Sequence, residues 1–207
     1  MKTQHLVILA ITGLGLLTAP AFGQEKVKES AASIAQRSCS LCHGPGGITS
    51  SELFPQLAGQ PAPYLVNQLT AFKEQTRSDL NARRFMWGIA SRLSDEDIKN
   101  LANYFSAQTP VLPVKVADTA AYERGKKIFT TGIPAKNVPA CMDCHGERGE
   151  GNDTTPRLGG QHEAYLIRQL NVFYNKRQRP DATAMHEVVK GLTKDDINAI
   201  AYYLQAQ

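Results

Sequence analysis

The chain has 207 residues, of which 42% are hydrophobic and 20% charged, and its formal net charge is +4. It is too apolar for a disordered chain, it lacks the glycine period of a collagen, and its basic residues are too dispersed to indicate nucleic-acid binding. This length permits one large domain or two small ones.

A secretory signal peptide is predicted over residues 1–23. Lys2 and His5 precede a short apolar run at 6–17, and small residues then follow as far as Gly23. This order is typical of a signal that is cleaved after export. The alternative is an uncleaved membrane anchor, but the run is short for a span of about 20 residues. We therefore expect the mature chain to enter an oxidising compartment.

The remainder of the chain contains an internal repeat. The pattern Cys-x-x-Cys-His at residues 39–43 returns at 141–145, an offset of 102 residues. The pattern Pro-x-Leu-x-Gly-Gln at 55–60 returns in order at 156–161, an offset of 101 residues. Because the two offsets nearly agree, the repeat predicts two tandem copies of one domain.

A proline-containing segment separates the two copies. Pro110 and Pro113 lack backbone N–H groups, and each pushes the residue before it into an extended conformation. We therefore predict a linker at 109–118 between an N-terminal domain at 24–108 and a C-terminal domain at 119–207. Domains of about 90 residues bury little surface, so a cofactor or a cross-link is expected to support each core.

Both copies are predicted to be helical. Five residues that share one helical face in the first copy recur in the second. They are Tyr64, Leu65, Gln68, Leu69 and Phe72, which return as Tyr165, Leu166, Gln169, Leu170 and Phe173. Ser94 and Thr193 are each followed three residues later by an aspartate, the start signal of a helix. Since no stretch alternates like a strand, the predicted fold class is all-α.

Each copy carries its two cysteines in a Cys-x-x-Cys-His pattern. On a helix, both sulfurs and the imidazole of this pattern face one side. Two thiols so placed can bond to the vinyl groups of a porphyrin, and the histidine then lies beneath the iron, which is c-type haem attachment. We therefore predict two covalent haem c groups. Their predicted attachment residues and iron ligands are Cys39, Cys42 and His43 in the first copy and Cys141, Cys144 and His145 in the second.

Three other roles fit the four cysteines less well. A shared structural zinc usually has its cysteine pairs about 15 to 20 residues apart, not about a hundred. A redox-active dithiol is expected beside a strand–helix–strand unit, which the sequence does not indicate. Disulfides within each pair would close very small loops and would add little stability.

A methionine is predicted as the second axial ligand of each iron. Met86 and Met185 follow the two motif histidines by 43 and 40 residues. A single methionine is more often core filler, but two at matched positions favour ligation. Met142 lies inside the second attachment motif, where the helix holds it away from the open face of its own haem.

Two histidines compete with Met185 for this role. His186 is its neighbour and His162 is more remote, whereas Trp87 and Pro61 stand at the matching places in the first copy. Histidine ligation would therefore break the repeat, and both histidines are interpreted as surface or packing residues. Methionine ligation raises the reduction potential, and two filled axial positions leave no place for a substrate. The prediction is an outer-sphere electron carrier, not an enzyme, with no catalytic residues.

The chain resembles the cytochrome c4 family of dihaem, two-domain bacterial cytochromes. The resemblance rests on the two Cys-x-x-Cys-His-Gly motifs, the two Pro-x-Leu-x-Gly-Gln segments and the matched methionines. It implies two class I cytochrome c folds related by a pseudo-twofold axis, with the haem edges facing each other. It also implies periplasmic electron transfer from a quinol–cytochrome c reductase or a dehydrogenase to a terminal oxidase. Members are soluble or held at the membrane surface, so peripheral membrane association is included in this expectation.

Two other functions stay open on the sequence. One is the cytochrome subunit of a periplasmic dehydrogenase complex, such as flavocytochrome c sulfide dehydrogenase, whose cytochrome partners can have a similar design. The other is a dihaem enzyme with one open or exchangeable iron, for which His186 is the only nearby indication.

Two surface features are also left with alternatives. Three basic clusters could dock an acidic redox partner, although ordinary solvated surface explains them as well. They are Lys126-Lys127, Lys176-Arg177 with Arg179, and Arg83-Arg84. The Pro-x-Leu-x-Gly-Gln segments are expected to cover one side of each haem, and a direct bond from Gln60 or Gln161 to the haem is left open.

Overall fold

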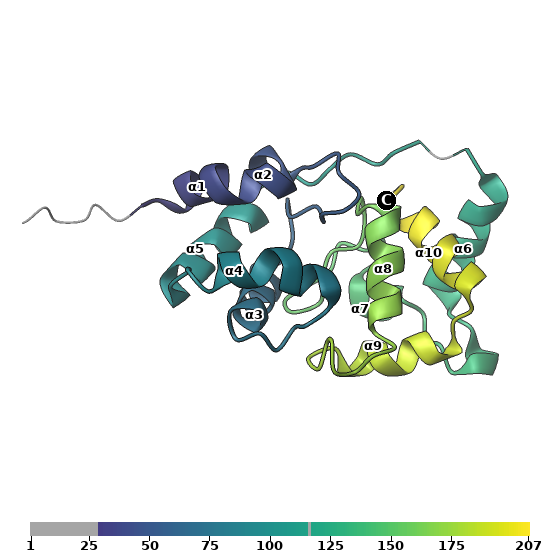
Figure 1. Cartoon of the computed structure of the whole chain (residues 1–207). Coiled ribbons are helices and arrows are strands. Elements are labelled where there is room, and N and C mark those ends of the chain that lie inside the picture. Colours follow the sequence, from purple (N-terminus) through teal and green to yellow (C-terminus); the bar gives the residue numbers. More distant parts are fainter. Residues whose placement is uncertain (1–28, 116) are drawn as a thin grey trace, which may run out of the picture.

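The helices of the chain form two sets that lie beside each other (Figure 1). The computed structural model describes residues 29–115 and 117–207, so the predicted signal peptide lies outside the described residues. The first set comprises α1 (Ala31–Ile34), η1 (Ala35–Cys39), α2 (Ser40–His43), η2 (Pro45–Gly47), α3 (Ala62–Lys73), η3 (Ala82–Met86), α4 (Trp87–Ala90) and α5 (Asp95–Ser106). The second comprises α6 (Thr119–Thr131), η4 (Pro134–Lys136), α7 (Met142–His145), α8 (Glu163–Val172), α9 (Thr183–Val188), η5 (Val189–Gly191) and α10 (Lys194–Leu204).

The all-α prediction is confirmed. The described part of the chain contains two isolated β-bridges and no strand. None of the helices in that part is long and apolar enough to cross a bilayer.

The terminal helix of each set begins where its sequence predicts. Ser94 accepts a hydrogen bond from the backbone N–H of Asp97, and the Asp97 side chain accepts one from the N–H of Ser94. Thr193 and Asp196 form the same reciprocal pair at the start of α10. Each pair satisfies two N–H groups that the first helical turn leaves without partners.

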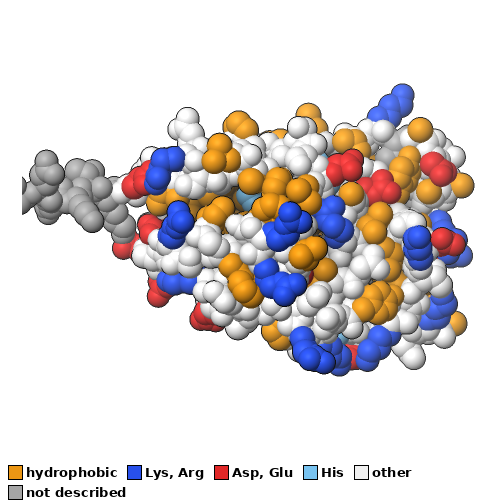
Figure 2. Space-filling model, in the orientation of Figure 1, with side chains coloured by type: hydrophobic (Ala, Val, Ile, Leu, Met, Phe, Trp, Pro, Cys, Tyr) orange, Lys and Arg blue, Asp and Glu red, His pale blue; other side chains and the backbone are white. Residues whose placement is uncertain are grey.

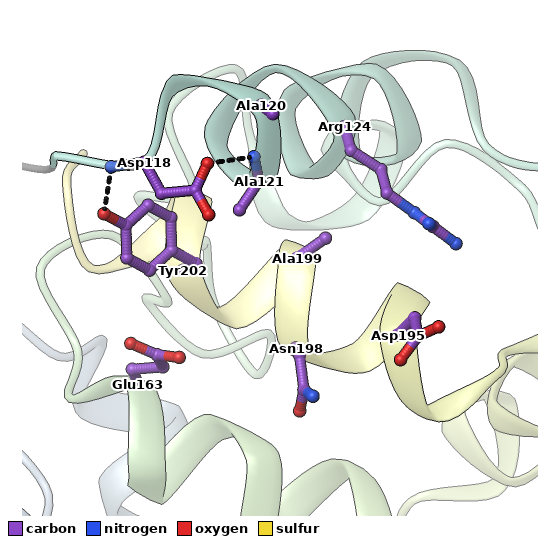
Figure 3. A pocket seen from close by; sticks show the side chains of 9 residues that line it. All are labelled: Asp118, Ala120, Ala121, Arg124, Glu163, Asp195, Asn198, Ala199 and Tyr202. Carbon is purple, nitrogen blue, oxygen red and sulfur yellow. Dashed lines mark hydrogen bonds between the residues drawn. The ribbon is translucent and has the colours of Figure 1, made fainter.

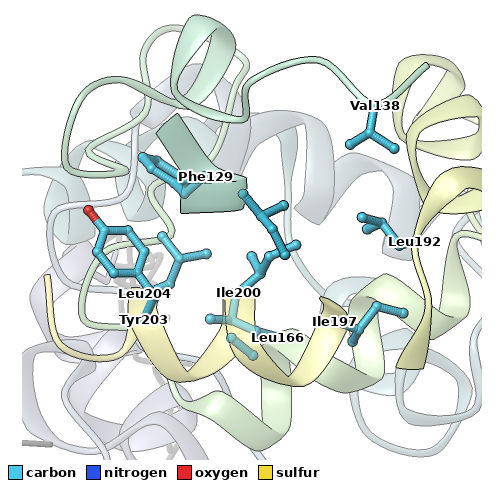
Figure 4. Close-up of a cluster of buried hydrophobic side chains, with 10 residues drawn as sticks. Phe129, Val138, Leu166, Leu192, Ile197, Ile200, Tyr203 and Leu204 are labelled. Atoms are coloured by element: carbon cyan, nitrogen blue, oxygen red, sulfur yellow. The ribbon is translucent and has the colours of Figure 1, made fainter. Parts of the chain in front are cut away.

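The core of the second set lies where α10 crosses α6 and α8 (Figure 4). Phe129 of α6 and Ile200 and Leu204 of α10 are almost fully buried there. The two helices approach closely at Gly125, because a Cβ atom at this position would lie 2.0 Å from the carbonyl oxygen of Ala199. The lack of a side chain at Gly125 therefore allows α6 and α10 to approach each other this closely.

Substitution of Gly125 by alanine is expected to destabilise the second set by about 3 kcal/mol. The clash is with backbone, which cannot rotate away, and it outweighs the gain of about 1 kcal/mol in helix propensity. Urea unfolding of the holoprotein measures the change. Gly88→Ala in α4 is the matched control, because a Cβ atom there meets nothing within 4 Å; this variant should be neutral or slightly more stable. Equal losses in the two variants would contradict the close approach at Gly125.

The two sets differ in how they lead into the Cys-x-x-Cys-His motif. In the first, α1, η1 and α2 run on without a break, and Cys39 is the ninth residue after the N-cap Ser30. In the second, α6 ends at Thr131 and a loop containing η4 intervenes, so Cys141 is the 23rd residue after the N-cap Asp118. The repeat did not reveal this difference because its matches begin at the motif itself.

The segment joining the two sets packs against both of them. A Cβ atom on Gly59 would lie 2.4 Å from Cγ of Pro110, and one on Gly160 would lie 3.3 Å from the carbonyl oxygen of Val111. Both glycines have a positive φ, 68° and 75°, which a side chain would strain. The two turns that precede Gln60 and Gln161 are thus held beside the same short stretch of chain.

Candidate functional site

A cavity of about 1200 Å³ extends across the contact between the two sets of helices. It is lined by all eight residues that the sequence predicts as haem-attachment and iron-ligand residues. They are Cys39, Cys42, His43 and Met86 from the first set and Cys141, Cys144, His145 and Met185 from the second. The structure therefore brings together, around one cavity, residues that lie up to 146 positions apart.

Both motif histidines stand at the end of a helix. His43 is the last residue of α2 and His145 is the last residue of α7, and each is followed by a glycine with positive φ. At Gly44 a Cβ atom would lie 1.8 Å from the carbonyl oxygen of Ile48, so only glycine allows the chain to turn there. The turn ends the helix and leaves each imidazole buried.

The tautomer of each histidine follows from its partner. His43 Nδ1 lies 2.9 Å from the carbonyl oxygen of Pro55, and His145 Nδ1 lies 3.0 Å from that of Pro156. A carbonyl only accepts, so Nδ1 carries the proton and the lone pair of Nε2 is free for a metal. Burial lowers the pKa of both histidines, against the smaller opposite effect of the prolyl carbonyls, which favours the neutral, ligating form.

The cysteines are in an environment that does not fit a redox-active dithiol. Burial raises the pKa of Cys39 and of Cys141 to about 11. Thiols of dithiol oxidoreductases have lowered pKa values instead. Within residues 29–115 and 117–207, no three His, Cys, Asp or Glu side chains are grouped closely enough to hold a metal ion.

The methionines, and not the neighbouring histidines, line the cavity. Met86 ends η3 and packs with Trp87 against Phe72, while Met185 lies in α9. His186 is buried and its Nδ1 lies 2.6 Å from the carbonyl oxygen of Phe173.

His162 also has partners elsewhere. Its Nε2 lies 2.9 Å from the carbonyl oxygen of Thr49 in the first set. Neither His162 nor His186 is among the residues that surround the cavity. Neither side chain is an exposed surface group, and within the described part of the chain Nε2 of His186 is buried without a hydrogen-bond partner.

A buried polar cluster that contains residues of both domains also lines the cavity. Arg77 donates to Asp79 at 3.0 Å, to Gln68 at 2.8 Å and, across the contact, to Gln169 at 3.0 Å. Burial alone would lower the Arg77 pKa, but the oxygens of the surrounding tyrosines and Asp79 together raise it, so the guanidinium stays charged. Sequence reasoning did not identify this cluster.

Arg179 corrects one interpretation of the sequence. It was grouped with Lys176 and Arg177 as a surface cluster, but its side chain is 4% exposed and donates to Gln169 and Asp181. The signal that was missed is the repeat of Arg-x-Asp at 77–79 and 179–181. Two equivalent arginines thus enter the contact between the domains from opposite sides.

The remaining basic clusters are exposed. Lys126, Lys127, Arg83, Arg84 and Lys176 all face solvent. On the face shown in Figure 2, Lys and Arg side chains are interleaved with hydrophobic ones and form no single continuous basic patch. These clusters therefore fit both a docking site for an acidic redox partner and ordinary solvated surface, the two roles that the sequence left open.

A second, smaller cavity lies away from the predicted site residues. It has a volume of about 420 Å³ and lies between α6, α10 and the start of α8 (Figure 3). Three of its polar side chains are already hydrogen-bonded: Asp118 accepts the N–H of Ala121, the Tyr202 hydroxyl accepts the N–H of Asp118, and Glu163 accepts from Gln205. It is lined by no cysteine, histidine or methionine.

Comparisons with known proteins relate the chain to cytochromes. The family model described as cytochrome c matches residues 28–108 and 122–207. A cytochrome c4 of Azotobacter vinelandii is 35% identical over 209 residues, which cover 97% of this chain and 95% of the relative. The cytochrome c4 structure of Acidithiobacillus ferrooxidans superposes with a TM-score of 0.76 at 38% identity, covering 82% of this chain and 99% of that one. A thiosulfate dehydrogenase electron acceptor of Thiomonas intermedia is 33% identical over 97% of this chain and 90% of its own length.

Proposed function

The chain belongs to the cytochrome c4 family, and from that premise we propose that it is a periplasmic dihaem electron carrier between respiratory-chain donors and a terminal oxidase. Membership implies covalently bound haem c and an electron-carrying role. The number of haems, their ligands, the partners and the compartment are parts of the proposal.

The observation that carries the proposal is the single cavity lined by both Cys-x-x-Cys-His motifs and both matched methionines. The cysteines would attach the two haems. His43 and Met86 would be the axial ligands of one iron, and His145 and Met185 those of the other. The donor set fits haem c, because each histidine presents Nε2 and each methionine presents a thioether that favours ferrous iron.

Haem iron with two protein ligands supplies a one-electron couple without an open coordination position. The protein's own contribution is to hold those ligands still. The Nδ1–H of each histidine is bonded to a backbone carbonyl, and the loop that bears each carbonyl is hydrogen-bonded to the other domain. A rigid ligand set of this kind suits electron transfer and leaves no place for a substrate, so we propose a carrier and no catalytic residue.

The proposal is tested by counting and characterising the haems. A pyridine haemochrome assay on the holoprotein should find two covalent haems per chain. The oxidised protein should show the iron–thioether charge-transfer band with an intensity that corresponds to both haems. One haem or none, or a band of half that intensity, would contradict the proposed ligand set.

A second function is favoured by a different observation. Relatives named thiosulfate dehydrogenase electron acceptor, from Thiomonas intermedia and Stutzerimonas stutzeri, match nearly the whole chain. This supports the alternative that the protein is the cytochrome partner of a periplasmic dehydrogenase. Purification from the native periplasm distinguishes the two: a freely migrating cytochrome supports the shuttle, and a stoichiometric complex with a dehydrogenase supports the alternative.

A further inference from the structure

The backbone carbonyl of Pro55, which accepts the hydrogen bond of His43, belongs to a peptide unit that makes a second hydrogen bond through its N–H. The unit that joins Pro55 to Gln56 accepts the Nδ1 proton of His43 through its oxygen, at 2.9 Å. The N–H of the same unit donates to Oε1 of Gln161, also at 2.9 Å. Gln161 belongs to the other domain, and its Nε2 donates back to the carbonyl oxygen of Gln56 at 3.1 Å.

The second histidine has the same arrangement with the domains exchanged. His145 Nδ1 lies 3.0 Å from the carbonyl oxygen of Pro156, and the N–H of the following residue, Arg157, donates to Oε1 of Gln60 at 3.0 Å. Nε2 of Gln60 donates to the carbonyl oxygen of Arg157 at 2.7 Å. Each domain therefore supplies one glutamine that hydrogen-bonds to the loop holding the motif histidine of the other domain. We call these two loops, at Pro55-Gln56 and Pro156-Arg157, the histidine loops.

Both glutamines are buried and rigidly placed. Gln60 is 5% exposed and Gln161 is 3% exposed. The N–H of the glycine before each one donates to the last turn of its own terminal helix, Gly59 to Phe105 and Gly160 to Leu204, at 2.9 Å in both cases. Each glutamine is thus anchored in its own domain while both ends of its amide are bonded in the other.

We propose that Gln60 and Gln161 are positioning residues that act across the domain contact, each on the axial histidine of the opposite domain. The inference rests on the proposed ligation of iron by His43 and His145. Gln161 would then affect the haem bound by His43, and Gln60 the haem bound by His145. The reduction potential of each haem would then depend on the docking of the other domain.

The direction of the effect follows from the polarity of a peptide unit. An acceptor on its N–H makes its carbonyl oxygen more negative, because linked hydrogen bonds strengthen one another. A more negative oxygen draws the Nδ1 proton more strongly, and this makes the imidazole a more basic ligand that stabilises ferric iron. Loss of the glutamine should therefore raise the potential of the haem in the other domain.

The test is the pair of variants Gln161→Leu and Gln60→Leu in the full holoprotein. Both midpoint potentials are measured, and each haem is assigned to its domain by NMR of its haem methyl groups. We expect Gln161→Leu to change the ferric-to-ferrous ratio of the haem on His43 alone by up to tenfold, which is about 59 mV for a one-electron couple. Gln60→Leu should do the same for the haem on His145 alone. The Nδ1–H resonance of the affected histidine should also move to higher field as its hydrogen bond weakens.

A control variant and a conservative substitution of each glutamine make the result decisive. Ser78→Ala removes a hydrogen bond to the carbonyl of Arg177 in the other domain without touching either histidine loop, and it should leave both potentials unchanged. Where a leucine variant fails to fold, Gln161→Asn or Gln60→Asn withdraws the amide while keeping its polarity and is expected to give the same crossed shift.

A shift of the haem in the glutamine's own domain, an equal shift of both haems or no shift would overturn the inference. These outcomes differ from failure of the proposed function. That failure would appear in the unaltered protein, as missing covalent haems or as an iron without a histidine ligand.

Discussion

Replacement of Met86 by alanine is expected to lower the potential of one haem by on the order of 100 mV, because the axial ligand sets haem potentials over a wide range and a thioether favours ferrous iron. Both haems should stay covalently attached, since Cys39 and Cys42 are unchanged. Potentiometric titration of the holoprotein measures the drop, and the charge-transfer band should fall to half its intensity. Met185→Ala should do the same to the other haem.

Met142→Ala is the control for this prediction. Met142 lies within the second attachment motif but packs against the core of its domain. Its loss should cost some stability and leave the charge-transfer band intact. If Met86→Ala leaves both potentials unchanged, Met86 is not an iron ligand; if Met142→Ala abolishes half of the band, the assignment in the second domain is wrong.

Replacement of Arg77 by methionine is expected to reduce the free energy of unfolding by about 3–5 kcal/mol, which is the cost of leaving a buried charge without its partner. The ion pair with Asp79 is nearly inaccessible to solvent, with side chains 6% and 4% exposed. The side-chain Oε1 atoms of Gln68 and Gln169, one from each domain, lose a donor as well. Urea unfolding of the holoprotein measures the change.

A double variant separates the lost charge pair from lost packing. Arg77→Met with Asp79→Asn should recover part of the stability, because the asparagine is neutral and its oxygen can still accept the N–H of Ala82. Lys73→Met removes an ion pair with the exposed Asp95 and should cost less than about 1 kcal/mol. A loss at Arg77 no larger than that at Lys73 would show that the buried pair adds little to folding.

Several features were predictable because their causes are local in the sequence. The Cys-x-x-Cys-His spacing predicts that its three side chains face one side, and in the structure the cysteines and histidines of both motifs line the same cavity. The capping pairs at Ser94 and Thr193 involve residues three positions apart, and both formed as predicted. The repeat matched Met86 with Met185, and both line the cavity.

The cluster around Arg77 and Arg179 was not predictable in this way. A charged side chain in a sequence is assigned to the surface by default, since burying a charge is unfavourable without partners. The partners of Arg77 include Gln169, which is 92 residues away and belongs to the other domain. Whether an arginine finds such partners depends on how two domains dock, and no local pattern reports that.

Residue spacing was enough to predict two helical repeats, each with a Cys-x-x-Cys-His motif and a matched methionine, because each of these features is a pattern that can be read along the chain. The docking of the two domains places both predicted sites around one cavity and brings Gln60 and Gln161 to the loop beside the motif histidine of the opposite domain. Their hydrogen bonds join residues 97 to 105 positions apart. Buried amides must find partners, and here the docked second domain supplies them.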